Sequence, residues 1–330
     1  MNVLSPVKPG GAPMTEGPLE IDEADLLADS PGATVVDRWT LSPAPEESRA
    51  AGMTWWPVAR VGLKLVTKRI IFKVFLGLGL MNFLFFSAMI YFLAGLAAQL
   101  KGQRFGEGPL EVARNFIFTG TGESYRDFIS SQNIVVMLLL AISGAVLVGN
   151  DFRFRSLTFY FSKPLERWQY FLGKLVATSL LVSMLTLLPC LALFIEYGLF
   201  GDTFDYFIES RRILFGILSY GLLVSVGMSI LLLGVAALLQ RTISIVMVWG
   251  LIFIFLPIVT EVVRNAANGS DYWELLNFWS LLQWCSNAFF GIEASLYSGE
   301  PWYPIGALLA WLGAALWAFW RKTRAVEVVS

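Results

Sequence analysis

The residues whose types and spacing could support chemistry lie in one stretch, Asn150–Lys174, which reads NDFRFRSLTFYFSKPLERWQYFLGK between two long apolar segments. The chain has no histidine, which excludes Ser-His-Asp and Cys-His nucleophile systems, histidine-bound zinc or haem, and histidine proton relays. Its two cysteines, Cys190 and Cys285, make no CxxC site or disulfide framework, and we interpret them as small apolar residues. We therefore predict no catalytic residue, no cofactor and no metal, and look to this stretch for binding.

Placed on a helix of 3.6 residues per turn, residues 151–162 separate into faces. The polar stripe consists of Asp151, Arg155, Thr158 and Ser162, one apolar flank of Phe154, Leu157 and Phe161, and the other of Phe152 and Phe159. Asp151 can pair with Arg155 across one turn. The Lys163-Pro164 pair ends the helix, and Leu165–Lys174 leads into the next apolar segment, with Arg167 and Lys174 at headgroup depth. This pattern favours a docking element for a cytosolic partner, and a plain basic loop that fixes topology is the alternative.

The elements that hold this stretch are apolar and long. Of the 330 residues, 56% are hydrophobic and only 15% are charged, with a mean hydropathy of +0.64, so we predict an all-α polytopic membrane protein. Each predicted span is near the roughly 20 residues that cross a bilayer. The six spans are Val74–Leu100, a second from about Phe128 or Ile134 to Gly149, Leu175–Ile195, Ile213–Gln240, Thr242–Thr260 and Pro301–Trp320. Pro189 and Pro257 lie within spans and are expected to kink them.

Basic residues predict the orientation. An even number of spans puts both termini on one side, and that side holds fourteen lysines and arginines of residues 57–330 against seven on the other. We therefore predict cytoplasmic termini in a cell (inner or plasma) membrane. The net charge of −1 shows no nucleic-acid footprint.

Three further segments lie outside the predicted spans. Residues 1–56 are acidic and rich in proline and glycine, which predicts a disordered cytoplasmic tail. From Trp55 to Lys73 the chain is basic and amphipathic, as expected of a helix in the headgroup layer of the bilayer. Between the fifth and sixth spans, the aromatic run Tyr272–Gly291 predicts an interfacial or re-entrant helix at the outer surface, with a seventh span as the alternative. The predicted membrane domain covers 57–322, and 323–330 form a short cytoplasmic tail.

The predicted spans contain no residues that would couple the protein to an ion gradient, and the chain has no phosphate-binding loop. No Asp, Glu, Lys or Arg lies in the middle of one, whereas ion-coupled carriers usually need such a group. No GxxxxGK[ST] phosphate loop occurs, so the chain has no such ATPase site. We found no polar constellation for a membrane-embedded enzyme inside the spans. Any energy would therefore enter through a partner.

The stretch DFRFRSLTFYFSKPLERWQYFLGKL resembles the first intracellular loop of ABC-2 type transporter permeases, and the six-span layout extends the resemblance over about residues 57–322. Ser162, Lys163 and Pro164 match the family's turn after a basic amphipathic helix. The Arg-x-x-Tyr-x-x-Gly-Lys stretch that opens the third span is matched by Arg167, Tyr170, Gly173 and Lys174. The acidic tail is a departure from the family pattern.

The resemblance implies a non-catalytic permease subunit, similar to stand-alone permeases and more often an exporter. Its partners would be two cytosolic ABC ATPase subunits and a second permease, identical or different. The coupling helix between the second and third spans would dock in the ATPase through Phe152, Phe154, Leu157 and Phe161 and through Asp151, Arg153 and Arg155. The alternative is a non-transporting membrane scaffold that recruits a partner through the same loop. The sequence does not identify a substrate.

Overall fold

The computed structural model describes residues 55–100, 118–149, 151, 166–200, 205–239, 241–266, 271–292, 300 and 302–327. Within these ranges the chain is helical and contains no strand. The described helices belong to one unit, Met53–Ser330. Six helical segments are long and apolar enough to cross a membrane: 70–92, 122–149, 167–200, 211–239, 242–266 and 302–323. The predicted six-span, all-α architecture is thus confirmed at this level.

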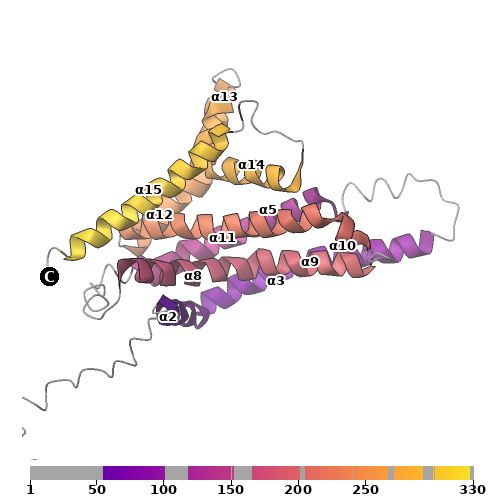
Figure 1. Ribbon diagram of the computed structural model, residues 1–330, viewed down its shortest axis with the longest axis horizontal. Coiled ribbons are helices and arrows are strands. Elements are labelled where there is room, and N and C mark those ends of the chain that lie inside the picture. Colours follow the sequence, from indigo (N-terminus) through magenta and orange to yellow (C-terminus); the bar gives the residue numbers. More distant parts are fainter. Residues whose placement is uncertain are drawn as a thin grey trace, which may run out of the picture. The chain divides into compact units, whose positions relative to one another are not determined.

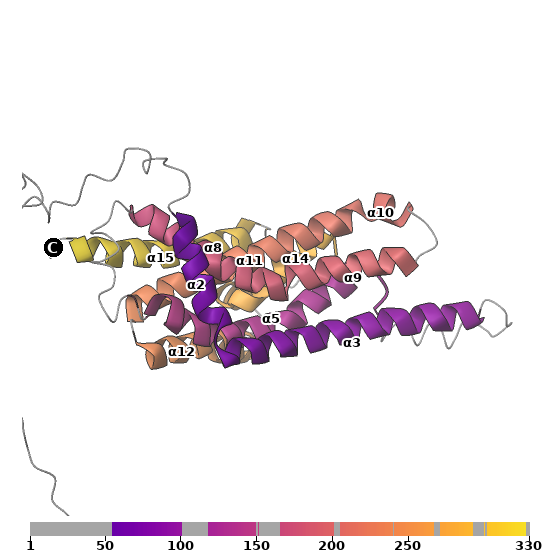
Figure 2. The ribbon, with the colours of Figure 1, turned by 90° about the horizontal axis from the view of Figure 1, so that it is seen from below.

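The first two described helices meet at a short elbow. Helix α2 (Trp55–Thr67) is amphipathic and runs at a steep angle to the long helices (Figure 2). It buries Ala59, Gly62 and Val66, which lie three and four residues apart and so share one face. This face packs on α8 (Arg167–Leu185), and after Thr67 the chain turns into α3 (Ile70–Leu100). The predicted basic helix before the first span is therefore present, and one face of it lies on protein.

The second span begins earlier than the sequence pattern indicated. Helix α5 covers Gly122–Gly144 and continues as a π-helical turn, η2 (Ala145–Gly149). The turn before it is held by the Ser124 hydroxyl, which accepts a hydrogen bond from the Thr119 backbone N–H at 3.1 Å. Gly120 there has a φ of +69°, a left-handed conformation that glycine adopts without strain. The first turns of α5 are polar yet still helical, because Tyr125 and Phe128 among them are fully buried by neighbouring helices.

The third span is interrupted just before Pro189. Helix α8 ends at Leu185, Thr186 forms a turn, and α9 covers Leu187–Phe200. Pro189 has no N–H to donate to the carbonyl of Leu185, four residues earlier, so the helical hydrogen-bond ladder breaks at this point. The expected disruption at Pro189 is thus present.

A similar interruption occurs in the fifth span. Helix α12 (Thr242–Gly250) passes through the π-helical turn η3 (Leu251–Phe255) into α13 (Leu256–Ala266). Pro257 leaves the carbonyl of Phe253 without its helical donor, and the indole N–H of Trp279 donates to that carbonyl at 3.0 Å. The freed backbone group is therefore satisfied by a side chain from another helix.

The core is centred on α11 (Arg211–Leu239), which packs against α15 (Trp302–Glu327), α8 and α14 (Phe278–Phe290) (Figure 1). The short helices α10 (Asp205–Glu209) and η4 (Asp271–Leu276) precede α11 and α14. By contrast, α3 exposes most of its apolar surface, as expected of a helix that faces lipid or another chain. The outer helix expected within 272–291 corresponds to η4 and α14, and its position relative to a membrane surface stays a prediction.

Candidate functional site

A buried ion pair joins Asp151, the first residue of the predicted coupling helix, to Lys174 of α8. The Lys174 ammonium lies 2.6 Å from the Asp151 carboxylate, and the Tyr170 hydroxyl donates a hydrogen bond to the same oxygen, Oδ2, at 2.8 Å. The side chain of Lys174 is 6% exposed and that of Asp151 15% exposed. We call Asp151, Tyr170 and Lys174 the anchor cluster. Because each charge offsets the other, neither is left uncompensated in a region of low dielectric constant.

The Lys174 ammonium has a second acceptor. It donates to the backbone carbonyl of Leu147, in the π-helical turn η2, at 2.5 Å. Lys174 therefore ties α8 to the end of the second span as well as to Asp151.

The aromatic face of the anchor cluster extends to the last helix. Tyr170 is fully buried, and its ring stacks on Phe319 of α15 with a centroid distance of 6.3 Å and an interplanar angle of 15°. The neighbouring Phe171 contacts the same ring at 5.0 Å. The start of α8 is consequently fixed against α15 on one side and against η2 on the other.

Gly173 allows α2 to lie directly on α8. A Cβ atom at this position would stand 2.8 Å from the Trp55 carbonyl oxygen and 2.7 Å from the Val58 Cβ atom. The first of these is a backbone atom, which cannot rotate away as a flexible side chain could. Only glycine fits this contact without a shift of one helix.

The structure thus brings together four residues of the predicted site: Asp151, Tyr170, Gly173 and Lys174. Arg167 is the first residue of α8, directly after its N-cap Glu166. Asp151 is bonded to Lys174 and Tyr170, and Lys174 is buried against protein. The pairing of Asp151 with Arg155 that the spacing suggested involves a residue outside the described ranges and stays a prediction. The remaining predicted residues, Phe152, Arg153, Phe154, Arg155, Leu157, Phe161, Ser162, Lys163 and Pro164, lie outside the described residues, so the amphipathic docking helix stays a prediction.

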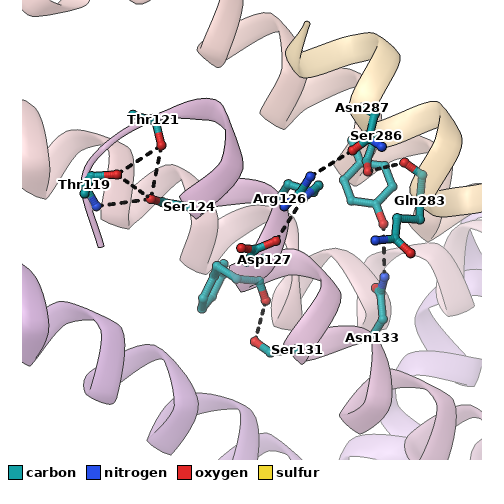
Figure 3. A network of polar contacts seen from close by, with 12 residues as sticks. Thr119, Thr121, Ser124, Arg126, Asp127, Ser131, Asn133, Gln283, Ser286 and Asn287 are labelled. Carbon is teal, nitrogen blue, oxygen red and sulfur yellow. Dashed lines mark hydrogen bonds and ion pairs between the residues drawn. The ribbon is translucent and has the colours of Figure 1, made fainter. Parts of the chain in front are cut away.

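A second polar cluster, which the sequence reasoning missed, lies between α5 and α14 (Figure 3). Arg126 of α5 donates to the Asn287 side chain of α14 at 3.0 Å and pairs with Asp127 at 2.8 Å. Two turns further along α5, the buried amide of Asn133 donates to the Tyr220 hydroxyl at 3.3 Å. Isolated polar residues leave a window apolar on average, so hydropathy did not reveal that these share a buried face.

Two buried acceptors of α5, Gln132 Oε1 and Asn133 Oδ1, and one hydroxyl of α8, Ser179 Oγ, have no hydrogen-bond partner among the described residues. No three His, Cys, Asp or Glu side chains within the described ranges lie close enough to hold a metal ion.

A third cluster fastens the region between the fifth and sixth spans. Arg264 of α13 pairs with Glu261 at 3.0 Å and with the nearly buried Glu274 of η4 at 2.9 Å. Ser280 of α14 donates to Glu274 as well. Further along α14, burial raises the pKa of the Cys285 thiol to about 11, so this thiol is protonated and unreactive at neutral pH.

Fold and side-chain placement together define the class: six long apolar helices indicate a multi-pass helical membrane protein. Beyond this class, no family model and no curated protein matches the chain.

Proposed function

We propose that the chain is the permease subunit of an ABC-2 type transporter, driven by a separate cytosolic ATPase that docks on the coupling helix of the 150–174 loop. Two observations support this function: the motif resemblance of residues 151–174, and the presence of six apolar helices around them. The observation that carries the proposal is the anchor cluster, because it bonds Asp151, where the predicted docking helix begins, to Tyr170 and Lys174 of α8.

The anchor cluster would transmit movement of the docking helix to the membrane helices. Separating the ion pair of Asp151 and Lys174 would leave a buried charge without its partner, which typically costs about 3–5 kcal/mol. A partner that moves the docking helix by a small distance would therefore carry α8 and η2 along with it. Through Tyr170 and Phe319 the same movement would reach α15. Motion of the docked ATPase would in this way be passed to three of the membrane segments.

The remaining parts follow from the same assignment. Both termini face the cytoplasm, the subunit lies in the inner or plasma membrane, and it pairs with a second permease, identical or different. The chain itself carries no hydrolytic site, and α2 and the outer helices η4 and α14 serve as interfacial elements. Substrate and direction of transport stay open, with export favoured by the resemblance alone.

The test is co-purification of the full chain with any ABC ATPase encoded beside its gene; the absence of such a gene would favour the scaffold alternative. In the double variant Leu157→Asp, Phe161→Asp, we expect loss of ATPase binding and of stimulated ATP hydrolysis, because two charges replace the predicted apolar docking face. The matched control is Ile208→Asp. Ile208 is an exposed apolar residue of α10, outside the 150–174 loop, and its variant is expected to keep full binding and stimulation.

The outcomes separate the hypotheses. If the double variant retains a fully stimulated ATPase, the docking proposal is wrong. If the unmodified chain binds a partner through this loop but no substrate changes the rate of ATP hydrolysis, a non-transporting scaffold explains the result better.

A further inference from the structure

The third span consists of two helices, α8 and α9, that meet at a break in the hydrogen-bond ladder. Pro189 has no N–H for the Leu185 carbonyl, so one of the bonds that would make a continuous helix is missing. The backbone N–H and the hydroxyl of Thr186 both donate to the Val182 carbonyl of α8, at 2.9 and 3.0 Å. A threonine hydroxyl bonded in this way often accompanies a bend. The stretch Thr186–Pro189 is therefore where α9 can change its angle to α8.

The far ends of these two helices are held by different contacts. The start of α8 is fixed by the anchor cluster and by the close contact of Gly173 with α2. Helix α9 ends at Phe200, at the opposite end of the bundle, where it lies beside α10 (Figure 2). A change of angle at the break would therefore move the end of α9 and leave α8 in place.

Three tyrosines join the end of α9 to α5 and α10. The Tyr197 hydroxyl of α9 donates to the Thr119 carbonyl at 2.8 Å, and the Tyr206 hydroxyl of α10 donates to the Gly120 carbonyl at 3.2 Å. Because this second bond uses the only hydroxyl proton of Tyr206, Tyr125 of α5 donates to the Tyr206 oxygen, at 3.1 Å. We call Tyr125, Tyr197 and Tyr206 the tyrosine cluster. Its three hydrogen bonds connect α9 and α10 to the start of the second span.

Ring contacts surround these hydroxyl groups. Phe194 of α9 contacts Tyr125 and Tyr206 at centroid distances of 5.9 and 5.5 Å, and Tyr197 contacts Tyr206 at 5.3 Å. Phe194 and Tyr125 are buried. A Cβ atom at Gly120 would overlap the Tyr197 ring, so this ring lies directly on the turn before α5. Because phenylalanine would keep the ring contacts, replacing a tyrosine of the cluster by phenylalanine tests its hydrogen bonds alone.

We propose that α9 moves as a rigid helix about a hinge at Thr186–Pro189, and that the tyrosine cluster holds it closed against α5 and α10. Opening separates Tyr197 from the Thr119 carbonyl and uncovers Phe194 and the Tyr125 ring, which are buried in the closed state. The end of the bundle opposite the anchor cluster thus has two states, one with its aromatic interior covered and one with it accessible. Hinge and cluster both lie within this chain, so the inference does not rest on the proposed docking of an ATPase.

The experiment measures the distance between two spin labels by double electron–electron resonance on the purified full chain in detergent. One label is attached at Leu199→Cys of α9 and the other at Ile305→Cys of α15, both exposed positions, in a background with Cys190→Ala and Cys285→Ala. Helix α15 packs on the central helix α11 and serves as the fixed reference. With the cluster intact, we expect one main distance, that of the closed state.

The double variant Tyr197→Phe, Tyr206→Phe removes all three hydrogen bonds and keeps the rings. Each lost bond is expected to raise the ratio of open to closed chains about threefold to tenfold, so the double variant should raise it by more than about tenfold. Tyr197→Phe alone should raise it about threefold to tenfold. The matched control is Tyr220→Phe, which removes a buried tyrosine hydroxyl bonded to Asn133 but to neither α9 nor α10, and it should leave the distances unchanged.

A further variant tests the hinge. Pro189→Ala restores the missing N–H, so the double tyrosine variant that also carries it should return to the closed distance. Far-UV circular dichroism checks each variant, and Tyr197→Phe alone decides the test if the double variant loses its helix content. The proposal is overturned if the tyrosine variants keep only the closed distance, or if Tyr220→Phe opens the chain equally, which would indicate general loosening. It is also overturned if Pro189→Ala leaves the open population unchanged, since the movement would then not depend on the break.

Discussion

Replacing Gly173 by alanine tests whether α2 is held against α8 by direct backbone contact. The added methyl group would lie 2.8 Å from the Trp55 carbonyl oxygen and 2.7 Å from the Val58 Cβ atom, closer than real Cβ contacts allow. Either α2 moves away or the start of α8 shifts, and the start of α8 carries the anchor cluster. The substitution is small, so its effect reports on this contact alone.

The size of the effect follows from two opposing contributions. Overpacking a tight contact costs about 1–3 kcal/mol, while alanine in place of glycine favours a helix by up to about 1 kcal/mol. Because one clashing atom belongs to the backbone, we expect the upper part of the first range and a net loss of about 1–2 kcal/mol. The matched control is Gly77→Ala in α3, where a Cβ atom would meet nothing within 4 Å. That variant is expected to be neutral or stabilised by up to about 1 kcal/mol.

The assay is reversible unfolding of the purified full chain in mixed micelles of dodecyl maltoside and increasing sodium dodecyl sulfate, followed by far-UV circular dichroism. If α2 and α8 meet at Gly173, we expect Gly173→Ala to unfold at a lower dodecyl sulfate fraction than the unmodified chain, and Gly77→Ala not to do so. Equal midpoints for the two variants would refute the claim that α2 and α8 meet at this glycine.

Three further outcomes are expected. Lys174→Met should destabilise the folded chain by about 3–5 kcal/mol because it leaves the Asp151 carboxylate buried without a cation, and adding Asp151→Leu should recover much of that loss in the same unfolding assay. In a Cys190→Ala background, a water-soluble maleimide should label Cys285 only after unfolding at pH 8. The pKa of Cys285 is raised from the ordinary value of 9.0 to about 11 in the folded chain, so burial of the protonated thiol stabilises the fold fully below pH 9.0. This contribution is lost as the pH rises through about 11. Unfolding midpoints measured between pH 8 and 11 should therefore fall. Arg264→Gln should increase proteolysis between the fifth and sixth spans, because two carboxylates lose their cation, and an unchanged cleavage rate would contradict this role.

The sequence predicted the spans because their apolar runs are long and nearly free of charge, and the helices confirm them. It also indicated the two proline interruptions, since a missing N–H is a local property that needs no knowledge of packing. The boundaries were less accurate: α5 begins at Gly122, and α13 continues to Ala266, past the predicted end of the fifth span at Thr260. In both cases charged residues near a helix end lowered the hydropathy, although they have partners: Arg126 bonds to Asn287 and Arg264 pairs with Glu274.

The candidate site shows what spacing alone can and cannot determine. The sequence singled out Asp151 and Lys174 individually, but it suggested a partner for Asp151 within the same helix, because neighbours one turn apart are the only contacts that periodicity predicts. The ion pair with Lys174 spans 23 residues of sequence and depends on how α8 packs beside η2. Likewise, no sequence pattern indicated that Asn133 and Tyr220 meet, since they come from different helices.

The anchor cluster bears on whether the 150–174 loop only fixes topology or binds a partner. A surface loop that merely fixed topology would need exposed cations, and exposed cations suffice for that role. Lys174 is instead nearly buried and shares its ammonium between a carboxylate and a backbone carbonyl, an arrangement whose desolvation cost is offset only by close, fully bonded geometry. Such geometry holds Asp151 at a fixed position against α8. If a partner docks on the 150–174 loop as proposed, this fixed contact would pass its motion into α8 and η2.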